Sequence, residues 1–408
     1  MPLYGFRNVH QSEALKGSLP LTQNNPQKLA NNLYAEQLSG SAFTRARSAN
    51  LHSWLYRTKP SVVHQDYVPS KLQLIAPLDP LQFPNPLRFS KLPSKTPKQD
   101  FLQGLFHLAS NKIAHVFLYN CTQSMREFFS SYDGELIFIP VAGTLNLHTE
   151  FGLISIEKGQ IAVIPRGVFF NVECESSAYG YLCENQSEPF ALPELGVLGA
   201  NALANPRHFI YPDAKVKESP APITLICKYQ DNCFIAKSSH SPLNVVAWQG
   251  NLAPYSYCLK LFTTINTVSF DHIDPSIFTL LTSASEIAGV ANLDFVLFPP
   301  RWSVAEHTFR PPYFHRNIMS ELMGLIWGKY EAKQEDFVKG GVSIHNSFIP
   351  HGPDAITFKE ASTCTQKPTY LNDSLAFMLE SRYPWQVTTK AMQHAIRQKD
   401  YTSCWQDL

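Results

Sequence analysis

The chain has 408 residues, of which 44% are hydrophobic, and its 34 Lys and Arg residues balance its 33 Asp and Glu residues almost completely. This composition is typical of a globular protein of two or three domains, and the net charge of +1 excludes the strong overall field that favours nucleic acid or an anionic membrane. No stretch approaches the roughly 20 apolar residues of a membrane span, and the start lacks the apolar core of a secretory signal, so we expect a cytoplasmic protein that acts on a small molecule.

Residues 1 to about 100 are rich in Pro, Asn, Ser and Gln, but they also contain Phe43, Leu51, Trp54 and Tyr56. Apolar side chains of this size disfavour free disorder. We therefore expect an extended N-terminal arm that wraps its own subunit or a neighbouring one. A loop-rich N-terminal domain is the alternative.

Two stretches show the pattern of short strands. Residues 113–172 consist of short apolar runs separated by Gly, Pro or Asp-Gly, which indicates an antiparallel sandwich or barrel. Residues 268–356 repeat this character, and residues 190–260 between them are interpreted as loops and short elements. The eight cysteines show no C-x-x-C spacing, so neither a zinc knuckle nor a disulfide framework is predicted.

After Thr363 the sequence favours helix. SLAFMLES, residues 374–381, has helical character, and residues 385–405 carry apolar side chains at Val387, Ala391, Ala395 and Ile396. We expect a terminal helix that packs on the second lobe.

The segment 298–354 holds His315, Glu321, His345 and His351 among aromatic residues, glycines and prolines. Two imidazoles and one carboxylate form a ligand set suited to a non-haem ferrous ion with open coordination positions. A spacing of six between His315 and Glu321 leaves the side chains about 120° apart on a helix but on one face of a strand. ELMGLIWGKYEA reads as a buried strand, after which Gly340 and Gly341 can return the chain to bring His351 alongside.

Other interpretations of these residues stay open. The histidines could be ordinary polar residues, although a buried Glu321 without a cation would cost several kcal/mol. Zinc is less suited because H-E-x-x-H is absent, and magnesium or calcium would need more oxygen ligands. His272 and His345 could accept and return a phenolic proton, or His272 could simply hydrogen-bond Asp271 or Asp274.

Long matches then identify a resemblance. The segments FDHIDPSIFTLL, FPPRWSVAEHTFRPPYFHRN, MSELMGLIWGKYEAK and IPHGPDA strongly resemble the homogentisate 1,2-dioxygenase family. NNLYAEQLSGSAFT, LIFIPVAGTLNLHTEFG and LGANALANPRHFIYP are also similar to that family, so the likeness covers nearly the whole chain.

The resemblance implies a mainly β fold of two cupin-like, jelly-roll-type lobes with an extended N-terminal arm and a few helices. Residues 1–265 would form the arm and a metal-free β lobe with connecting loops. Residues 266–408 would form a jelly roll that binds Fe(II), with the terminal helix. The assembly would be a homo-hexamer, a dimer of trimers, without nucleic acid or membrane partners.

The same resemblance implies a ring-cleaving dioxygenase of tyrosine and phenylalanine catabolism that converts homogentisate and O2 to 4-maleylacetoacetate. His315, Glu321 and His351 would be the Fe(II) ligands, His272 the catalytic acid/base and His345 a second active-site histidine. Tyr330 would contact the substrate, as would His351. A cupin isomerase, an extradiol dioxygenase acting on catechols or gentisate, and a non-catalytic cupin are the alternatives.

Overall fold

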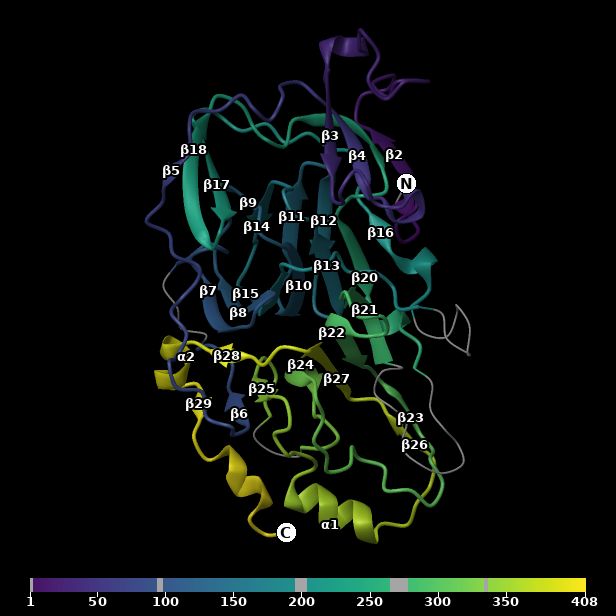
Figure 1. Ribbon diagram of the computed structural model, residues 1–408, viewed down its shortest axis with the longest axis vertical. Helices are drawn as coiled ribbons and strands as arrows, with labels where there is room; N and C mark the ends of the chain where they lie inside the picture. Colours follow the sequence, from purple (N-terminus) through teal and green to yellow (C-terminus); the bar gives the residue numbers. More distant parts are fainter. Residues whose placement is uncertain (1–2, 94–97, 195–203, 265–277, 334–336) are drawn as a thin grey trace.

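The computed structural model describes residues 3–93, 98–194, 204–264, 278–333 and 337–408, and their strands build an upper and a lower lobe in Figure 1. Among these residues the longest helix is α1 (Ala355–Thr363), and none is long and apolar enough to span a bilayer. The prediction of a mainly β fold with two lobes and few helices is confirmed.

Two sheets face each other in the N-terminal lobe. Phe138 of one sheet packs on Phe170 of the other, with ring centroids 5.7 Å apart. The inner sheet has the order β1-β16-β20-β13-β10-β15-β8-β7-β28 and the outer sheet β12-β11-β14-β9-β17-β18-β5. The strand bounds are β5 (Val68–Pro69), β7 (Leu105–Ser110), β8 (Ala114–Cys121), β9 (Phe128–Ser131), β10 (Glu135–Ala142), β11 (Leu145–Thr149), β12 (Gly152–Ile156), β13 (Gln160–Ile164), β14 (Phe170–Glu173), β15 (Ala178–Asn185), β17 (Ile223–Tyr229), β18 (Asn232–Ser238) and β20 (Tyr255–Cys258).

Burial follows the sequence pattern of these strands. β8 is buried along its whole length, as expected for a strand of apolar residues that is covered on both faces. β11 alternates between buried and half-buried residues, because only one of its faces meets the core.

The first residues pack against their own chain. β1 (Leu3–Tyr4) pairs with β16 (Ile210–Tyr211), and β2 (His10–Glu13) pairs with β19 (Val245–Gly250). β3 (Tyr34–Ser39) and β4 (His52–Arg57) complete a sheet of order β2-β19-β4-β3. The N-terminal arm was expected to wrap either its own subunit or a neighbouring one, and these contacts fit the first alternative.

The C-terminal sheet carries the predicted ligand residues. Its order is β21-β22-β27-β24-β25-β6-β29, and a small pair, β23-β26, lies beside it (Figure 1). The bounds are β6 (Leu87–Phe89), β21 (Thr279–Ala284), β22 (Ala291–Phe298), β23 (Arg301–Ser303), β24 (Ser320–Gly328), β25 (Val342–His345), β26 (Thr369–Leu371), β27 (Ser374–Ser381), β28 (Gln386–Val387) and β29 (Arg397–Gln398).

The two lobes share one hydrophobic core and exchange strands. The Tyr181 hydroxyl of β15 donates to the carbonyl of Gly341 at 2.7 Å, and its ring packs on Phe377 of β27. β6 comes from the N-terminal part of the chain but pairs with β25 and β29, whereas β28 comes from the C-terminal part and pairs with β7. The lobes are therefore interlocked.

The helical expectation for SLAFMLES is wrong, because Ser374–Ser381 forms strand β27 between β22 and β24. Its residues Leu375 to Leu379 are all buried. A short, continuous apolar run shows no alternation of apolar and polar residues, so its sequence cannot distinguish a strand from a helix.

The terminal helix expected from the pattern of residues 385–405 is only five residues long. α2 (Thr389–Gln393) begins at Thr388, whose hydroxyl accepts a hydrogen bond from the N–H of Ala391, but the chain leaves the helix at His394. Arg397 then pairs with Phe89 of β6, and residues 401–405 form a 3-10 turn. Strand pairing with a distant segment has overridden the local helical pattern.

Residues 223–250 form β17, β18 and β19, where loops and short elements were expected. Trp248 of β19 is fully buried and donates its indole N–H to the carbonyl of Phe151 at 3.0 Å. Its neighbours in the sheet, β2 and β4, are about 200 residues away in sequence, so local patterns did not reveal the strand.

Candidate metal centre

Two backbone pairings bring the predicted ligand residues together. Glu321 is the second residue of β24 and lies opposite His345 of β25. His315 precedes β24 and His351 follows β25, and these two residues form an isolated antiparallel bridge. The N–H of each donates to the carbonyl of the other, at 2.9 and 3.1 Å. The ring centroids of His315 and His351 are consequently 4.2 Å apart.

Gly352 permits the close approach of the two segments that meet in this bridge. A Cβ atom at this position would lie 2.4 Å from the ring of Phe314 and 2.9 Å from its Cα. Only a hydrogen fits there, so the chain after His351 can pass directly beside the chain before His315.

The donor atoms of His315, Glu321 and His351 all lie within 4.8 Å of one another. The His351 Nε2 is 3.0 Å from one oxygen of Glu321, and the His315 Nε2 is 3.4 Å from the other. Each ring turns its Nδ1 to a backbone carbonyl, that of Tyr313 for His315 and that of Ile349 for His351. Because a carbonyl only accepts, each Nδ1 carries the proton in the neutral ring, and each Nε2 presents its lone pair to the cluster.

This arrangement fits a metal ion. Two nitrogen lone pairs and a carboxylate facing one another repel, unless a cation or added protons lie between them. Burial opposes ionisation of Glu321, but the imidazoles of His315, His345 and His351 outweigh burial and lower its pKa well below the usual range. Burial likewise opposes the charge of His315, but the carboxylate raises the pKa of that ring. The cluster is therefore built around a negative charge that a cation would neutralise.

Asn317 and His345 surround the three donors. The Asn317 amide donates to the first oxygen of Glu321 at 2.6 Å and fixes the direction of the carboxylate. His345 is 4% exposed and stacks on the ring of His351 with centroids 4.0 Å apart. Its Nε2 shares a 2.7 Å hydrogen bond with the hydroxyl of Tyr401. Burial, aided by His351, lowers the pKa of His345 to about 3, so this ring is neutral.

Tyr330 lies in the same cavity as the three donors, and it is 8% exposed. Burial raises its pKa far above that of a free phenol, so Tyr330 keeps its proton at neutral pH. His272 lies outside the described residues, and its predicted place beside the donors stays a prediction.

Two cavities border His315 and His351. The inner cavity has a volume of about 40 Å³ and is lined by Pro312, His315, Glu321, Met323, Tyr330, Ala332, Lys333, Phe337, Ser343, His345, His351, Gly352 and Tyr401. The outer one is an open depression of about 610 Å³ that includes Phe314, Arg316 and Trp405. His315 and His351 thus border both a small inner cavity and a larger open depression, and Glu321 lines the inner cavity.

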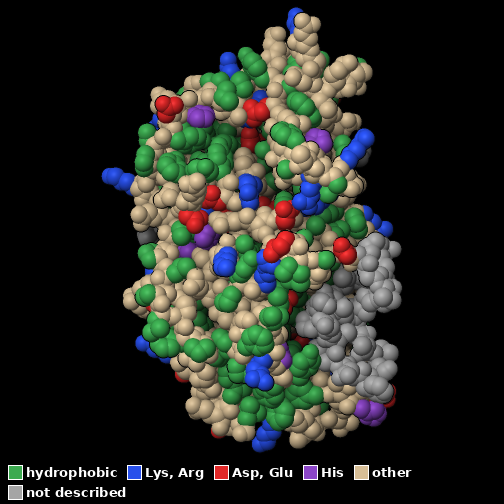
Figure 2. Space-filling view, viewed as in Figure 1, with side chains coloured by type: hydrophobic (Ala, Val, Ile, Leu, Met, Phe, Trp, Pro, Cys, Tyr) green, Lys and Arg blue, Asp and Glu red, His purple; other side chains and the backbone are tan. Residues whose placement is uncertain are grey.

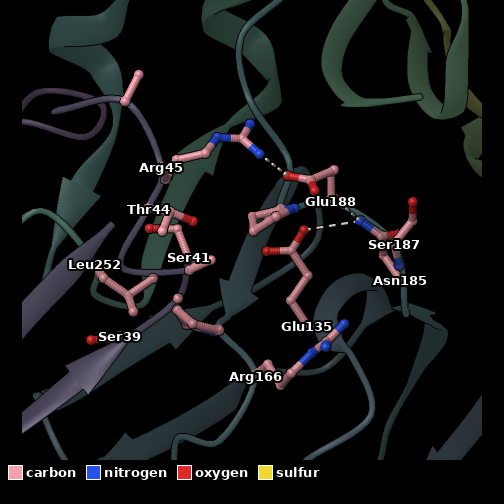
Figure 3. Close-up of a pocket in the computed structure, with 15 residues that line it drawn as sticks. Ser39, Ser41, Thr44, Arg45, Glu135, Arg166, Asn185, Ser187, Glu188 and Leu252 are labelled. Atoms are coloured by element: carbon pink, nitrogen blue, oxygen red, sulfur yellow. Dashed lines mark hydrogen bonds and ion pairs between the residues drawn. The ribbon is translucent and has the colours of Figure 1, made fainter. Parts of the chain in front are cut away.

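A cavity of about 620 Å³ lies in the N-terminal lobe, far in sequence from these donors. Figure 3 shows Arg45 paired with Glu188 at one side of it and the carboxyl group of Glu135 pointing into it. The described residues of its lining include no His or Cys, so its size does not make it a candidate for metal chemistry.

A second cluster of possible metal donors, His115, Glu184 and Asp231, lies in the N-terminal lobe. The ammonium of Lys228 is 3.0 Å from Glu184, 2.7 Å from Asp231 and 2.6 Å from Asp133. This cluster already contains a cation of its own, whereas the cluster at Glu321 does not.

Sequence reasoning missed Asn317, Lys333 and Tyr401. Asn317 could have been found, since it stands two residues after His315 and four before Glu321. Tyr401 lies 56 residues after His345, in a segment expected to be helical, and nothing local marks it as a partner.

Family models match the whole chain in two parts. Residues 2–259 match the model described as homogentisate 1,2-dioxygenase N-terminal, and residues 260–408 match the C-terminal one. A protein of Legionella pneumophila (strain Philadelphia 1) named homogentisate 1,2-dioxygenase is 56% identical over 409 residues, which cover 100% of this chain and 98% of that protein. A protein of the same name from Nitrobacter hamburgensis is 48% identical over 417 residues, which cover 99% and 93%.

Solved structures resemble the chain only weakly. Ylba from Escherichia coli is 10% identical with a TM-score of 0.34, covering 74% of this chain and 93% of that one. The Escherichia coli pirin YhhW is 8% identical with a TM-score of 0.30, covering 78% and 96%.

Proposed function

The chain belongs to the homogentisate 1,2-dioxygenase family, and we propose that it opens the aromatic ring of homogentisate at the metal centre formed by His315, Glu321 and His351. It is an oxidoreductase, as its relatives are named. The observation that supports the location is the convergence of two lone-pair nitrogens and a buried carboxylate, with cavities on both sides.

We propose ferrous iron as the metal. Two imidazoles and one carboxylate are the ligand set of non-haem iron oxygenases, which leaves further positions open for two reactants. When bound, the ion would bring a phenol and dioxygen together and allow triplet oxygen to react with the electron-rich ring. The expected product is 4-maleylacetoacetate, which forms when the ring opens and both atoms of O2 are incorporated.

The surrounding residues have separate tasks in this proposal. Asn317 holds the Glu321 carboxylate in one orientation, and His345 holds the ring of His351 through their stacked contact. Tyr330 keeps its proton and can donate a hydrogen bond to a substrate hydroxyl. His272 would accept the phenolic proton and later return it, a role that comes from the family resemblance.

We propose a homo-hexamer built from trimers as the assembly. Large apolar side chains are exposed on the C-terminal lobe, among them Tyr313, Phe314 and Phe348. Figure 2 shows hydrophobic side chains gathered in its lower part, and contiguous patches of this kind favour a protein interface. Sedimentation velocity of the native chain would give the mass of the assembly.

Oxygen uptake tests the activity. Protein purified without metal and reconstituted anaerobically with Fe(II) should consume one O2 per homogentisate and release a product with the absorbance of the opened ring. Gentisate and catechol should give little uptake at the same concentration. Absence of uptake with homogentisate in iron-loaded protein would overturn the proposal. Equal uptake with gentisate would show that the enzyme does not select homogentisate over other dihydroxylated aromatic acids.

A further inference from the structure

Lys333 is a buried cation on the wall of the inner cavity. It follows β24 and is 7% exposed, although lysine is almost never buried without a counter-charge. Among the described residues, no carboxylate lies within ion-pair distance of its ammonium. Its hydrogen-bond partner there is the thiol of Cys404 at 3.9 Å.

The remaining neighbours of Lys333 within the described part of the chain do not replace a counter-ion. The ammonium lies 4.2 Å from the ring centroid of Trp405 and 5.5 Å from that of Tyr401. Asp354 is near enough to favour the charge, but its carboxylate accepts the N–H of Thr357 at the start of α1. Burial outweighs these groups and lowers the pKa of Lys333 to about 8. The ammonium is thus largely buried, and the described residues compensate its charge only in part.

Arg88 adds a second buried positive charge. This residue of β6 is 2% exposed, and its guanidinium lies flat on Tyr401, 3.7 Å from the ring centroid. Its Nε and one terminal nitrogen have no hydrogen-bond partner among the described residues. Lys333 therefore lines the cavity directly, and Arg88 lies behind the lining residue Tyr401. Among the described lining residues the carboxylate is that of Glu321, which belongs to the metal donors.

We propose that the ammonium of Lys333 binds the carboxylate of the acetate side chain of homogentisate in the inner cavity. This inference rests on the proposed function. The cavity of about 40 Å³ has room for roughly three waters, which is the size of a carboxylate group rather than of an aromatic ring. Its lining includes the metal donors as well as Lys333, so one small molecule can reach both.

The ion pair also determines specificity. A hydroquinone that lacks the acetate carboxylate leaves the buried ammonium without its partner, and a site built around a buried charge rejects such an analogue strongly. Arg316, on the outer depression, is the other cation that could bind the substrate carboxylate. It is exposed and stays hydrated when it has no partner, so it would discriminate weakly against an analogue without the carboxylate.

The test compares Lys333→Met with two controls, using homogentisate and 2-methylhydroquinone, in which a methyl group replaces the acetate arm. Lys329→Met removes an exposed lysine four residues away, and Arg316→Met removes the competing anchor. Metal content and circular dichroism verify that each variant is folded and loaded. Anaerobic titration calorimetry measures binding of both compounds without turnover, and steady-state assays give KM and kcat.

We expect Lys333→Met to weaken homogentisate binding and raise its KM roughly 10- to 100-fold, with binding of 2-methylhydroquinone changed less than about threefold. Lys333→Arg, which keeps the charge, should recover part of the affinity, and both controls should behave like the native chain.

Unchanged binding and KM in Lys333→Met, or the same loss for both compounds, would overturn the inference. A loss confined to Arg316→Met would assign the carboxylate to the outer depression instead. If the native chain showed no oxygen uptake with homogentisate, the proposed function itself would fail, which is a different result. Should Lys333→Met not fold, the comparison of Lys333→Arg with the native chain on the two compounds decides: identical discrimination at identical affinity counts against the inference.

Discussion

Glu321 of β24 and His351 of the loop after β25 meet at 3.0 Å, oxygen to Nε2, although 30 residues separate them. The His351 ring cannot donate to Glu321 through this nitrogen when it is neutral, because its proton is on Nδ1 and bonded to the carbonyl of Ile349. The pair therefore requires a positive charge between its members, and the first two predictions concern how that charge is held.

Replacing Glu321 with Gln should remove most of the metal that the chain can bind. The amide keeps the shape of the side chain but supplies no negative charge, so metal affinity should fall by at least about 100-fold. Metal per chain after dialysis against Fe(II) or Co(II) measures it. Glu380→Gln, opposite Glu321 on β27, is the matched control and should keep its metal. Native metal content in Glu321→Gln would contradict the ligand assignment.

Asn317→Ala removes the 2.6 Å hydrogen bond to the carboxylate while leaving all three donors in place. Partners of this kind orient the ligand, and their loss commonly costs roughly 10- to 100-fold in metal affinity or activity. Competition with a chelator gives the affinity. A variant with native affinity and native turnover would show that Glu321 is positioned by the strand alone.

His272→Phe should keep its iron but turn over more slowly, by about 100-fold or more if the ring handles the phenolic proton. Metal analysis combined with stopped-flow oxygen uptake separates the two effects. An unimpaired rate would remove the acid/base role, and a variant without iron would instead make His272 part of the metal centre.

Glu135→Gln should alter the pH dependence of stability. Burial raises the pKa of Glu135 to about 7, although the N–H of Phe190 and the amide of Asn185 oppose the shift. The folded protein holds this proton more tightly than the unfolded chain, so the contribution to stability is complete below about pH 4.5 and is lost as the pH rises through 7.

The variant should therefore gain stability over the native chain above pH 7, up to roughly 3 kcal/mol at about 1.36 kcal/mol per pKa unit, and gain little at pH 5. Thermal unfolding between pH 5 and 8 measures the difference. Glu188 is a half-exposed carboxylate of the same cavity (Figure 3), and Glu188→Gln should leave the thermal stability unchanged at both pH 5 and pH 8. Equal shifts at pH 5 and pH 8 would count against a buried acid.

Lys228→Met should destabilise the N-terminal lobe. The Lys228 ammonium, 2% exposed, compensates Asp133, Glu184 and Asp231, and these carboxylates outweigh burial and raise its pKa. Loss of one member of a buried ion cluster costs roughly 3 to 5 kcal/mol. Urea unfolding at pH 7 measures this cost, with Lys237→Met on β18 as an exposed control. A change below about 1 kcal/mol would show that water enters the cluster.

Sequence patterns predicted the strand that carries Glu321 and the return of the chain after it. The run from Glu321 to Gly328 is too apolar for a surface strand, and the return through Gly340, at φ of 80°, leads into the antiparallel pair that sets Glu321 opposite His345. The even spacing between His315 and Glu321 favoured one strand for both residues, but His315 lies before β24 and is placed by its bridge to His351. These signals are local, and local signals are what a sequence shows directly.

Other features depend on contacts between distant segments. Ser374–Ser381 could have been a helix by its own pattern, and its burial between β22 and β24 decides the matter. Arg88 reaches Tyr401 across more than 300 residues, so the positive charge behind this lining residue could not be inferred from the segment that holds the ligands. Asn317 was within reach of sequence reasoning, but its role became clear only from its distance to Glu321.

The exchange of β6 and β28 has a consequence for anyone who divides this polypeptide. A fragment that starts at residue 260, where the second family model begins, would leave out β6 and with it the guanidinium stacked on Tyr401, and it would uncover the pairing edge of β25. The companion fragment would lose β28, which covers one edge of β7, and β7 would keep only its pairing with β8. Each half therefore lacks a strand that it needs, and the sheet that carries the candidate metal centre is complete only when β6, from the first hundred residues, has paired with β25 and β29.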